Sequence, residues 1–246
     1  MSVKEYLPAC FAGMPIFTYD MVDSTNNAAK RYFLDGGILP ALFIADGQTA
    51  GRGRNGRSFF SPSGAGLYMS LALPINTSPD KAISFTAIAA VAVCKAIEQL
   101  TDIRPAIKWV NDIYVSERKV CGILVEAMPD KDGNMAAVIG IGINVLGVDF
   151  PEELRDIAGS VESQCGVSLS RAELCTAVYD ELLEIYRDWQ KDSACCLFCL
   201  SVFCLFYRAS VFHRGKRAYG RICFLYSEGD MPCRSVKARR KVRSSS

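Results

Sequence analysis

The chain has 246 residues, and its near-neutral formal charge of +2 conceals two differently charged parts. Residues 194–246 contain 11 Lys and Arg against 2 Asp and Glu, a net charge of +9, whereas residues 1–193 contain 17 against 24, a net charge of −7. Because 50% of the residues are hydrophobic, disorder is excluded for most of the length. We therefore expect one domain over residues 1–193 and a differently built tail over residues 194–246.

Cysteine and histidine usage narrows the chemistry of the first part. Its five cysteines are far apart, which is ordinary for reduced thiols, and its start lacks the pattern of a secretory signal. The one histidine, His213, lies in the tail. Catalytic triads that need histidine and metal sites with several histidines are therefore excluded from residues 1–193. The separated cysteines and the lack of a signal pattern lead us to expect a cytoplasmic protein.

The hydrophobic pattern predicts alternating short strands and helices. Strands are expected at residues 16–19, 42–45, 67–73, 107–110, 113–115, 120–126 and 136–145, and helices at residues 26–34, 79–100, 151–157 and 170–189. Short polar turns join the last strands, which indicates antiparallel hairpins. Locally paired strands with helices between them predict an α+β fold, with a mixed, largely antiparallel sheet and flanking helices.

Residues 47–66 form a long segment with six glycines, three arginines and no sustained apolar run, which is typical of a functional loop. Its centre, residues 51–57, reads GRGRNGR. Glycines let the backbone approach a ligand, and the guanidinium groups of Arg52, Arg54 and Arg57 match phosphate or carboxylate oxygens. The loop predicts an anionic ligand. An arginine–glycine RNA-binding tract and a merely solvated basic loop are the alternatives.

Three further motifs carry polar groups. KWVND at residues 108–112 supplies a lysine, an amide and a carboxylate that suit nucleotide hydroxyls or Mg²⁺, although this pentapeptide alone favours an exposed ion pair between Lys108 and Asp112. Lys119 precedes an apolar strand and is equally typical of a turn. The alternating glycines of GIGIN at residues 140–144 leave room for a backbone or a ligand ring, but their spacing excludes a Rossmann fingerprint.

Taken in order, these motifs resemble those of the biotin protein ligase family over roughly residues 14–190. The matching segments are DSTN at 23–26, QTAGRGRNGR at 48–57, SP at 61–62, GLYMS at 66–70, KWVND at 108–112, KVCGILVE at 119–126 and GIGIN at 140–144. The resemblance implies a monofunctional enzyme that converts biotin and MgATP to biotinyl-5′-adenylate and pyrophosphate. It then transfers biotin to a lysine of a biotin carboxyl carrier protein.

The resemblance also implies roles for individual residues. The implied biotin-binding residues are Ser24, Thr25, Asn26, Gln48, Arg52, Gly53, Arg54 and Lys119. The implied ATP-binding residues are Arg57, Phe59, Lys108, Asn111, Asp112 and Asn144, with Phe59 stacking on adenine where tryptophan is common. Lys119, Arg54 and Lys108 are the implied catalytic residues. No metal cage of protein ligands is expected, and Mg²⁺ enters with ATP near Asp112.

The implied partners are biotin and the carrier protein of a biotin-dependent carboxylase. The sequence does not determine the oligomeric state, and a homodimer is one of the possible states. The roughly twenty residues before Ser24 are too few for the winged helix of ligases that double as repressors, so DNA binding is not expected. A membrane segment is not expected either. The alternatives are a lipoate ligase and a catalytically impaired biotin-binding or RNA-binding protein.

Residues 194–246 do not match the small SH3-like barrel that closes relatives in this family, because this Cys-rich, basic segment lacks alternating strands. A membrane or nucleic-acid patch, a divergent barrel and a segment from a shifted reading frame are three interpretations, and we favour the last. A fourth is a Zn²⁺ site built from Cys196, Cys199, His213, Cys223 and Cys233. Sequencing the coding DNA around codon 193 tests the shifted frame, which a clean frame without a better barrel-like alternative would contradict.

Overall fold

A computed structural model of the chain describes residues 13–75, 82–108, 111–191, 211–213 and 216–218. The predicted boundary at residue 193 and the cysteines of the tail lie outside these residues. Of the tail, the structure describes two short strands, β8 (Val211–His213) and β9 (Lys216–Ala218), which pair antiparallel. The interpretations of the tail therefore stay predictions.

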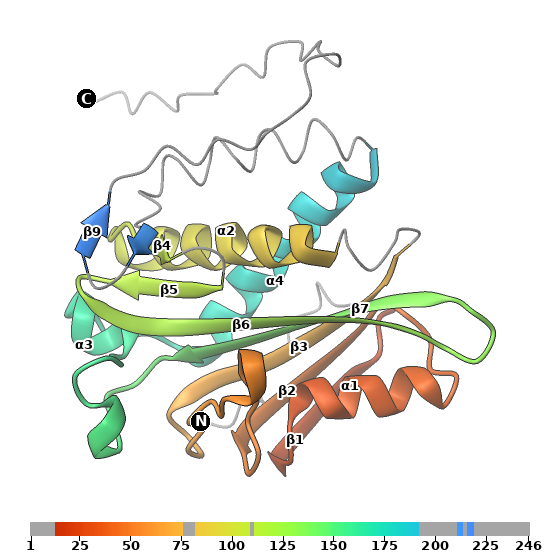
Figure 1. The fold of residues 1–246 in the computed structure, drawn as a ribbon, viewed down its shortest axis with the longest axis horizontal. Coiled ribbons are helices and arrows are strands. Elements are labelled where there is room, and N and C mark those ends of the chain that lie inside the picture. Colours follow the sequence, from red (N-terminus) through yellow and green to blue (C-terminus); the bar gives the residue numbers. More distant parts are fainter. Residues whose placement is uncertain (1–12, 76–81, 109–110, 192–210, 214–215, 219–246) are drawn as a thin grey trace, which may run out of the picture.

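A seven-stranded sheet forms the centre of the described fold (Figure 1). Its strands are β1 (Ile16–Val22), β2 (Ala41–Gln48), β3 (Gly66–Ile75), β4 (Ala106–Lys108), β5 (Asp112–Val115), β6 (Arg118–Pro129) and β7 (Met135–Asn144), in the order β1-β2-β3-β7-β6-β5-β4. Only β1 and β2 run parallel within this sheet, because a helix connects them, and all the other neighbouring strands are antiparallel. The predicted mixed, largely antiparallel sheet is confirmed.

Helices cover the two faces of the sheet unequally. On one face, α2 (Ala82–Thr101) and α4 (Arg171–Lys191) pack together over the main hydrophobic core (Figure 1). The window Ser84–Thr101 of α2 is long and apolar enough to cross a membrane by length and composition, but 72% of it is buried inside the protein. Of the helices in the described residues, the ten-residue α1 (Thr25–Leu34) covers the other face, over a smaller cluster around Phe43. Part of that second face is therefore left for a loop to cover.

The helix expected at residues 151–157 is wrong. A single 3₁₀ turn forms there, Glu152–Leu154, and the short helix α3 (Val161–Cys165) follows it. The backbone after the 3₁₀ turn pairs with β6 instead: Lys119 N donates to Ile157 O at 2.8 Å, and Gly159 N donates to Lys119 O at 2.9 Å. A short exposed helix is marginal, so this extended pairing prevails.

An ion pair ties the end of β2 to α4, and a hydrogen bond joins it to the far end of residues 47–66, here called the arginine loop. Arg171 Nη1 lies 2.6 Å from Asp46 Oδ1, and Ser63 Oγ donates to Asp46 Oδ2 at 2.7 Å. Burial alone would raise the pKa of Asp46, but hydrogen bonds from Ser63 and Arg171 outweigh it, so this pKa lies below its usual value. The pair connects the end of β2, the loop and α4.

We expect Arg171→Met to lower the free energy of unfolding by about 1–3 kcal/mol, because the half-buried Asp46 carboxylate loses a charged donor. Lys191→Met is the matched control. Its pair with Asp188 is 76% and 62% exposed, so we expect a change below about 0.5 kcal/mol. Urea denaturation of both variants measures the difference, and equal losses would contradict the structural role of Asp46.

Candidate ligand-binding site

Two adjoining cavities lie on the sheet face that α1 covers only in part. Ser24, Thr25, Asn26, Gln48, Arg52, Phe59, Gly122, Leu124, Gly140, Ile141 and Gly142 line the first cavity. Arg52, Gly53, Arg54, Asn55, Arg57, Ser58, Phe59, Asn111, Asp112, Lys119, Gly122 and Ile123 line the second, which has a volume of about 280 Å³. Arg52, Phe59 and Gly122 line both. The structure thus brings together all the predicted site residues except Lys108 and Asn144.

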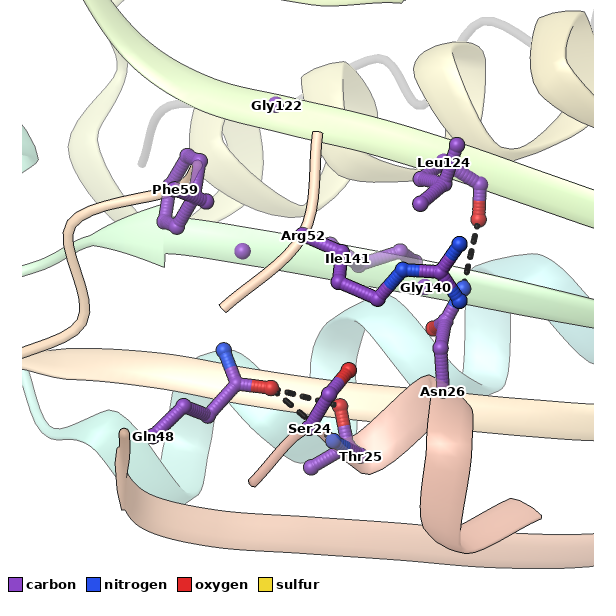
Figure 2. A pocket seen from close by; sticks show the side chains of 11 residues that line it. Ser24, Thr25, Asn26, Gln48, Arg52, Phe59, Gly122, Leu124, Gly140 and Ile141 are labelled. Carbon is purple, nitrogen blue, oxygen red and sulfur yellow. Dashed lines mark hydrogen bonds between the residues drawn. The ribbon is translucent and has the colours of Figure 1, made fainter. Parts of the chain in front are cut away.

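The first cavity lies at the N-terminus of α1 and is polar on one side (Figure 2). Gln48 Oε1 accepts hydrogen bonds from Thr25 N at 2.9 Å and Thr25 Oγ1 at 3.3 Å, and Gln48 Nε2 donates to Ser61 Oγ at 2.9 Å. Ser24 is the N-cap residue of α1, yet its side chain makes no capping hydrogen bond although it is only 1% exposed. A buried hydroxyl that lines a cavity can form a hydrogen bond with a ligand there, and the binding of biotin by Ser24 stays a prediction.

Asn26 lines the same cavity, but its amide is engaged with the protein. Its Nδ2 donates to Leu124 O at 3.3 Å and to Glu126 Oε2 at 3.0 Å, and the Ser70 hydroxyl lies 2.6 Å from its Oδ1. Gly140 leaves the space for this amide, which a Cβ there would overlap. The structure gives Asn26 a positioning role, and its contact with biotin stays a prediction.

The arginine loop is more regular than its composition indicates. Gly53 N donates to Arg57 O at 2.7 Å and Phe59 N donates to Gly51 O at 2.9 Å, so residues 51–59 double back as a narrow hairpin. At its tip, Asn55 and Gly56 have φ values of 57° and 73°, the positive values that Asn-Gly adopts readily in tight hairpins. The hairpin extends the arginines over the second cavity.

Cations surround a single carboxylate in the second cavity. Arg54 Nη1 donates to Asn111 Oδ1 at 2.9 Å, and Asn111 Nδ2 donates to Asp112 Oδ1 at 2.9 Å. Lys119 Nζ lies 2.8 Å from the same Asp112 oxygen. Arg57 also lines the cavity. Lys119, Arg54 and Arg57 outnumber Asp112, so this cavity suits an anion.

A β-bulge places Lys119 in the cavity. Between β5 and β6 the register shifts, so that Tyr114 faces Lys119 while Ile113 faces Cys121, and Val120 is the extra residue. Val120 and Cys121 are both completely buried in the core on the α2 side. Regular alternation would place Lys119 in that core, and the bulge turns it to the face that carries Asp112.

Phe59 separates the two cavities. Gly122 and Gly142 are cross-strand partners, and Cβ atoms on them would stand 3.1 Å and 2.6 Å from the Phe59 ring. The ring therefore lies against backbone that carries no side chains, and Figure 2 shows Phe59 beside the strand that carries Gly122. With Phe59 there, the first cavity measures only about 20 Å³, room for one or two water molecules.

Two predicted residues lie beside the cavities and do not line them. Lys108 Nζ lies 5.5 Å from the centre of the Tyr114 ring, and Lys108 faces Asp112 in the register of β4 and β5. Asn144 is 9% exposed, and its Nδ2 donates to Gly159 O at 3.1 Å. Their implied contacts with ATP stay predictions.

The sequence reasoning missed the residues that form the floor and one wall of the first cavity. Gly122, Leu124 and Ile141 lie within motifs that it had recognised, but no function was assigned to them. Alternation along β6 and β7 was the available signal, because Gly122 and Leu124 occupy positions opposite to the apolar core residues.

We expect Gly142→Ala to force the Phe59 ring off the floor and to lower the free energy of unfolding by about 1–3 kcal/mol. Gly147→Ala is the matched control, because a Cβ at Gly147 has no atom within 4 Å, and we expect it to change stability by less than about 0.5 kcal/mol. Urea denaturation distinguishes the two. A Gly142→Ala protein as stable as the parent would show that the ring does not depend on this floor.

Comparison with known proteins places the chain in a family. Residues 19–144 match the biotin/lipoate A/B protein ligase family. The chain is 37% identical over 179 residues to the bifunctional ligase/repressor BirA of Bacillus subtilis, covering 72% of this chain and 55% of that protein. It is 36% identical over 173 residues to the biotin–[acetyl-CoA-carboxylase] ligase of Paracoccus denitrificans, covering 68% of this chain and 70% of that protein. The chain thus spans about half the length of the Bacillus relative.

A solved structure agrees with the sequence comparisons. The biotin protein ligase of Aquifex aeolicus, in complex with biotin and ATP, matches with a TM-score of 0.62 and 31% identity, covering 72% of each chain. Its fold is that of the sheet and helices described above. The chain belongs to the biotin/lipoate A/B protein ligase family.

Proposed function

We propose that the chain is an ATP-dependent biotin ligase. The observation that carries this proposal is the pairing of a small polar cavity with a larger cationic one, with Lys119 close to their junction. Gly122 lines both cavities, and Lys119 Nζ lies 3.4 Å from the position of a Cβ on Gly122. A molecule with a neutral polar ring and a carboxylate tail fits this order of groups. The relatives named as biotin ligases support the same substrate.

The first cavity would bind the ring system of biotin. Its cyclic urea offers donors and acceptors, which the Ser24 hydroxyl and the Thr25 and Gln48 side chains complement. A bicyclic ring exceeds a cavity of about 20 Å³, so the Phe59 ring moves from the glycine floor when biotin binds. Phe59 would then be free to contact the adenine of ATP.

In the first step, a carboxylate oxygen of biotin attacks the α-phosphorus of ATP. A new oxygen–phosphorus bond forms, and the bond to the β-phosphate oxygen breaks and releases pyrophosphate. Lys119 holds the attacking carboxylate, and Arg54 and Arg57 offset the negative charge that develops on the phosphoryl oxygens. Alignment and charge suffice for this step, so no histidine is needed.

In the second step, the neutral amine of an acceptor lysine attacks the acyl carbon of biotinyl-5′-adenylate. An amide bond forms, AMP leaves with the electron pair of the broken bond, and the amine loses a proton to solvent. The arginine hairpin closes over the intermediate in the meantime, because water would otherwise hydrolyse it. The acceptor would be a biotin carboxyl carrier protein, in keeping with the name of the Paracoccus relative.

Mg²⁺ would accompany ATP. Among the described residues no group of three His, Cys, Asp or Glu side chains could hold a metal ion, so the ion would be held mainly by phosphate oxygens. Asp112 in the second cavity is the carboxylate that fits such an ion. The ion would supply charge neutralisation on the phosphates.

Other expectations from the sequence are untested predictions. They include a cytoplasmic location, the absence of DNA and membrane binding, and the open question of a homodimer. The description of the family covers both biotin and lipoate ligases, so lipoate stays the alternative substrate. Incubation with ATP, Mg²⁺, an apo carrier domain and either biotin or lipoate, read by mass, tests the proposal. Biotinylation is expected, and lipoylation or an unmodified carrier would contradict it.

We expect Arg54→Gly to release biotinyl-5′-adenylate and to modify bystander lysines, because the hairpin loses its hydrogen bond to Asn111. Adenylate in the filtrate should rise by roughly tenfold relative to the parent. Arg155→Gly, at an exposed position that lines neither cavity, is the control and should release no more than the parent. An Arg54→Gly protein that releases no more adenylate than the parent would show that the hairpin does not retain the intermediate.

We expect Lys119→Met to slow adenylate formation by about 100-fold, since a charged donor to the reacting carboxylate is lost. Lys108→Met should slow it less, because Lys108 lies outside the lining of both cavities. Pyrophosphate release measures both rates. A larger effect at Lys108 than at Lys119 would reverse the roles of the two lysines.

A further inference from the structure

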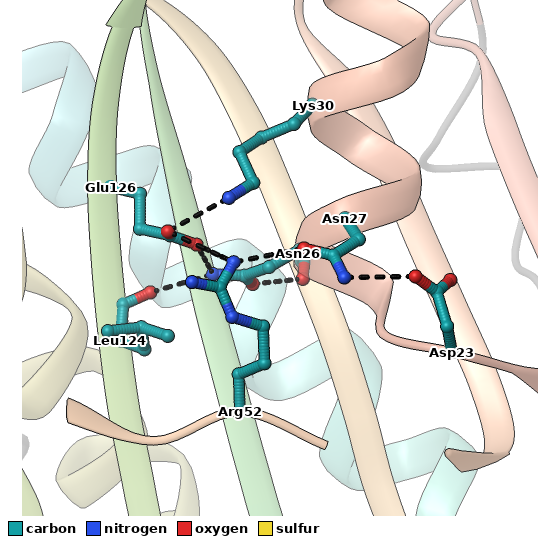
Figure 3. A network of polar contacts seen from close by, with 8 residues as sticks. Asp23, Asn26, Asn27, Lys30, Arg52, Leu124 and Glu126 are labelled. Carbon is teal, nitrogen blue, oxygen red and sulfur yellow. Dashed lines mark hydrogen bonds and ion pairs between the residues drawn. The ribbon is translucent and has the colours of Figure 1, made fainter. Parts of the chain in front are cut away.

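Glu126 gathers three parts of the site although it lines neither cavity (Figure 3). It lies on β6 and its carboxylate meets donors from two other segments. Lys30 Nζ of α1 lies 2.9 Å from Oε1, and Asn26 Nδ2, also of α1, donates to Oε2 at 3.0 Å. Arg52 Nη1 of the arginine loop lies 3.1 Å from Oε1 and 3.2 Å from Oε2.

The carboxylate of Glu126 is charged at neutral pH. Its side chain is 23% exposed. Burial by itself would raise the pKa of Glu126, but hydrogen bonds from Asn26 and Lys30 and the charges of Lys30 and Arg52 outweigh it, so this pKa lies below its usual value. A group with a lowered pKa keeps its contacts above that pKa and loses them only on acidification. The network is therefore intact at the pH at which a cellular enzyme works.

Glu126 fixes the base of the arginine hairpin. Arg52 Nη1 also donates to Asn27 Oδ1 at 2.9 Å, and Asn27 Nδ2 donates to Asp23 Oδ2 at 2.9 Å. Arg52 is thus held between β6 and α1, at the junction of the two cavities. By contrast, the outer Arg54 contacts the neutral amide of Asn111. The charge of Arg52 is offset within the protein, whereas the charge of Arg54 is directed at the second cavity.

The same carboxylate also orients Asn26, which shapes the first cavity. The Ser70 hydroxyl donates to Asn26 Oδ1, and Asn26 Nδ2 donates to Leu124 O and to Glu126. These contacts give the Asn26 amide one orientation. Without Glu126, two cations and an amide donor would face one another across a small space. Lys30 and Arg52 would then be expected to separate, and the hairpin base would move with Arg52.

We propose that Glu126 is a positioning residue, which holds Arg52 and Asn26 so that the biotin cavity and the base of the hairpin exist before substrate arrives. The kinetic part of this inference rests on the proposed function. Glu126 would act through Arg52 and Asn26 and would contact neither substrate.

Lys30 provides a control on the same carboxylate. It pairs with Glu126 but lines neither cavity and does not belong to the hairpin. Lys30→Met therefore removes an ion pair from Glu126 and leaves Arg52 and Asn26 in place. A purely structural role for Glu126 would make Lys30→Met and Glu126→Gln similar.

Steady-state kinetics test the proposal. Glu126→Gln should raise the KM for biotin by roughly tenfold and change kcat and the KM for ATP by less than about threefold, because it disturbs the biotin cavity. Lys30→Met should leave all three within about twofold. In an Arg52→Met background, Glu126→Gln should cost less than it costs in the parent, since one of the two residues that it positions is already changed. Fully additive losses, or equal effects of Lys30→Met, would overturn the proposal.

Limited proteolysis tests the same idea without substrate or activity. We expect trypsin to cleave Glu126→Gln after Arg52, Arg54 and Arg57 roughly fivefold faster than it cleaves the parent or Lys30→Met. Mass spectrometry of the fragments measures these rates. Unchanged cleavage would contradict a hairpin held by Glu126, whether or not the chain ligates biotin. If Glu126→Gln does not fold, Asn27→Ala, which removes the second acceptor of Arg52, should accelerate the same cleavages, and parent-like cleavage would count against the network.

Discussion

The unequal covering of the two sheet faces is the constraint on which the site depends. On the α2 face, side chains from two long helices fill the space above the sheet and leave a dry core. On the other face, α1 has ten residues and covers only part of the area. Cross-strand glycines, Gly122 and Gly142, lower the floor beside it. The arginine hairpin lies over that floor, so the cavities lie between a hairpin of cations and the part of the sheet where Gly122 and Gly142 carry no side chains.

Polar contacts then divide the hairpin into parts with different tasks. Its base is held at Arg52 by a carboxylate and an amide of the neighbouring elements, and the chain after it is held where Ser63 donates to Asp46, the ion-pair partner of Arg171. Its tip is exposed and turns at Asn55 and Gly56. A segment anchored at both ends can move at the tip without losing its place. This arrangement would suit the lid of the proposed ligase.

Lys119 shows how a local irregularity serves the site. The strand that carries it must bury apolar residues on the α2 side, and a lysine in perfect alternation would fall among them at a high cost in desolvation. The bulge at Val120 resolves the conflict, because two successive residues enter the core and Lys119 turns to Asp112. The Asp112 carboxylate is the anion beside Lys119.

Much of the fold and most of the site follow from the sequence by itself. Hydrophobic periodicity identifies all seven strands of the sheet and the helices α1, α2 and α4, because burial on one face imposes a period of two or 3.6. The glycine and arginine spacing predicts a loop with an anionic ligand, since these residue types combine close backbone approach with cationic forks, but it does not predict that residues 51–59 form a hairpin. The motif order identifies the family. The helix predicted at residues 151–157 fails, because that segment gains more from pairing with Lys119 than from a helix without an apolar face.

Only the tertiary structure decides how these groups are shared between cavities and supports. Asn26 and Arg52 read from the sequence as ligand contacts, yet their hydrogen bonds go to Glu126, which lies 100 and 74 residues away. Asn144 likewise holds the backbone of Gly159. The Phe59 ring separates two cavities because cross-strand register, which no local pattern encodes, brings two glycines together beneath it. The sequence determines which residue types are present and the face on which each lies, and long-range register and packing determine which of them remain available to a ligand.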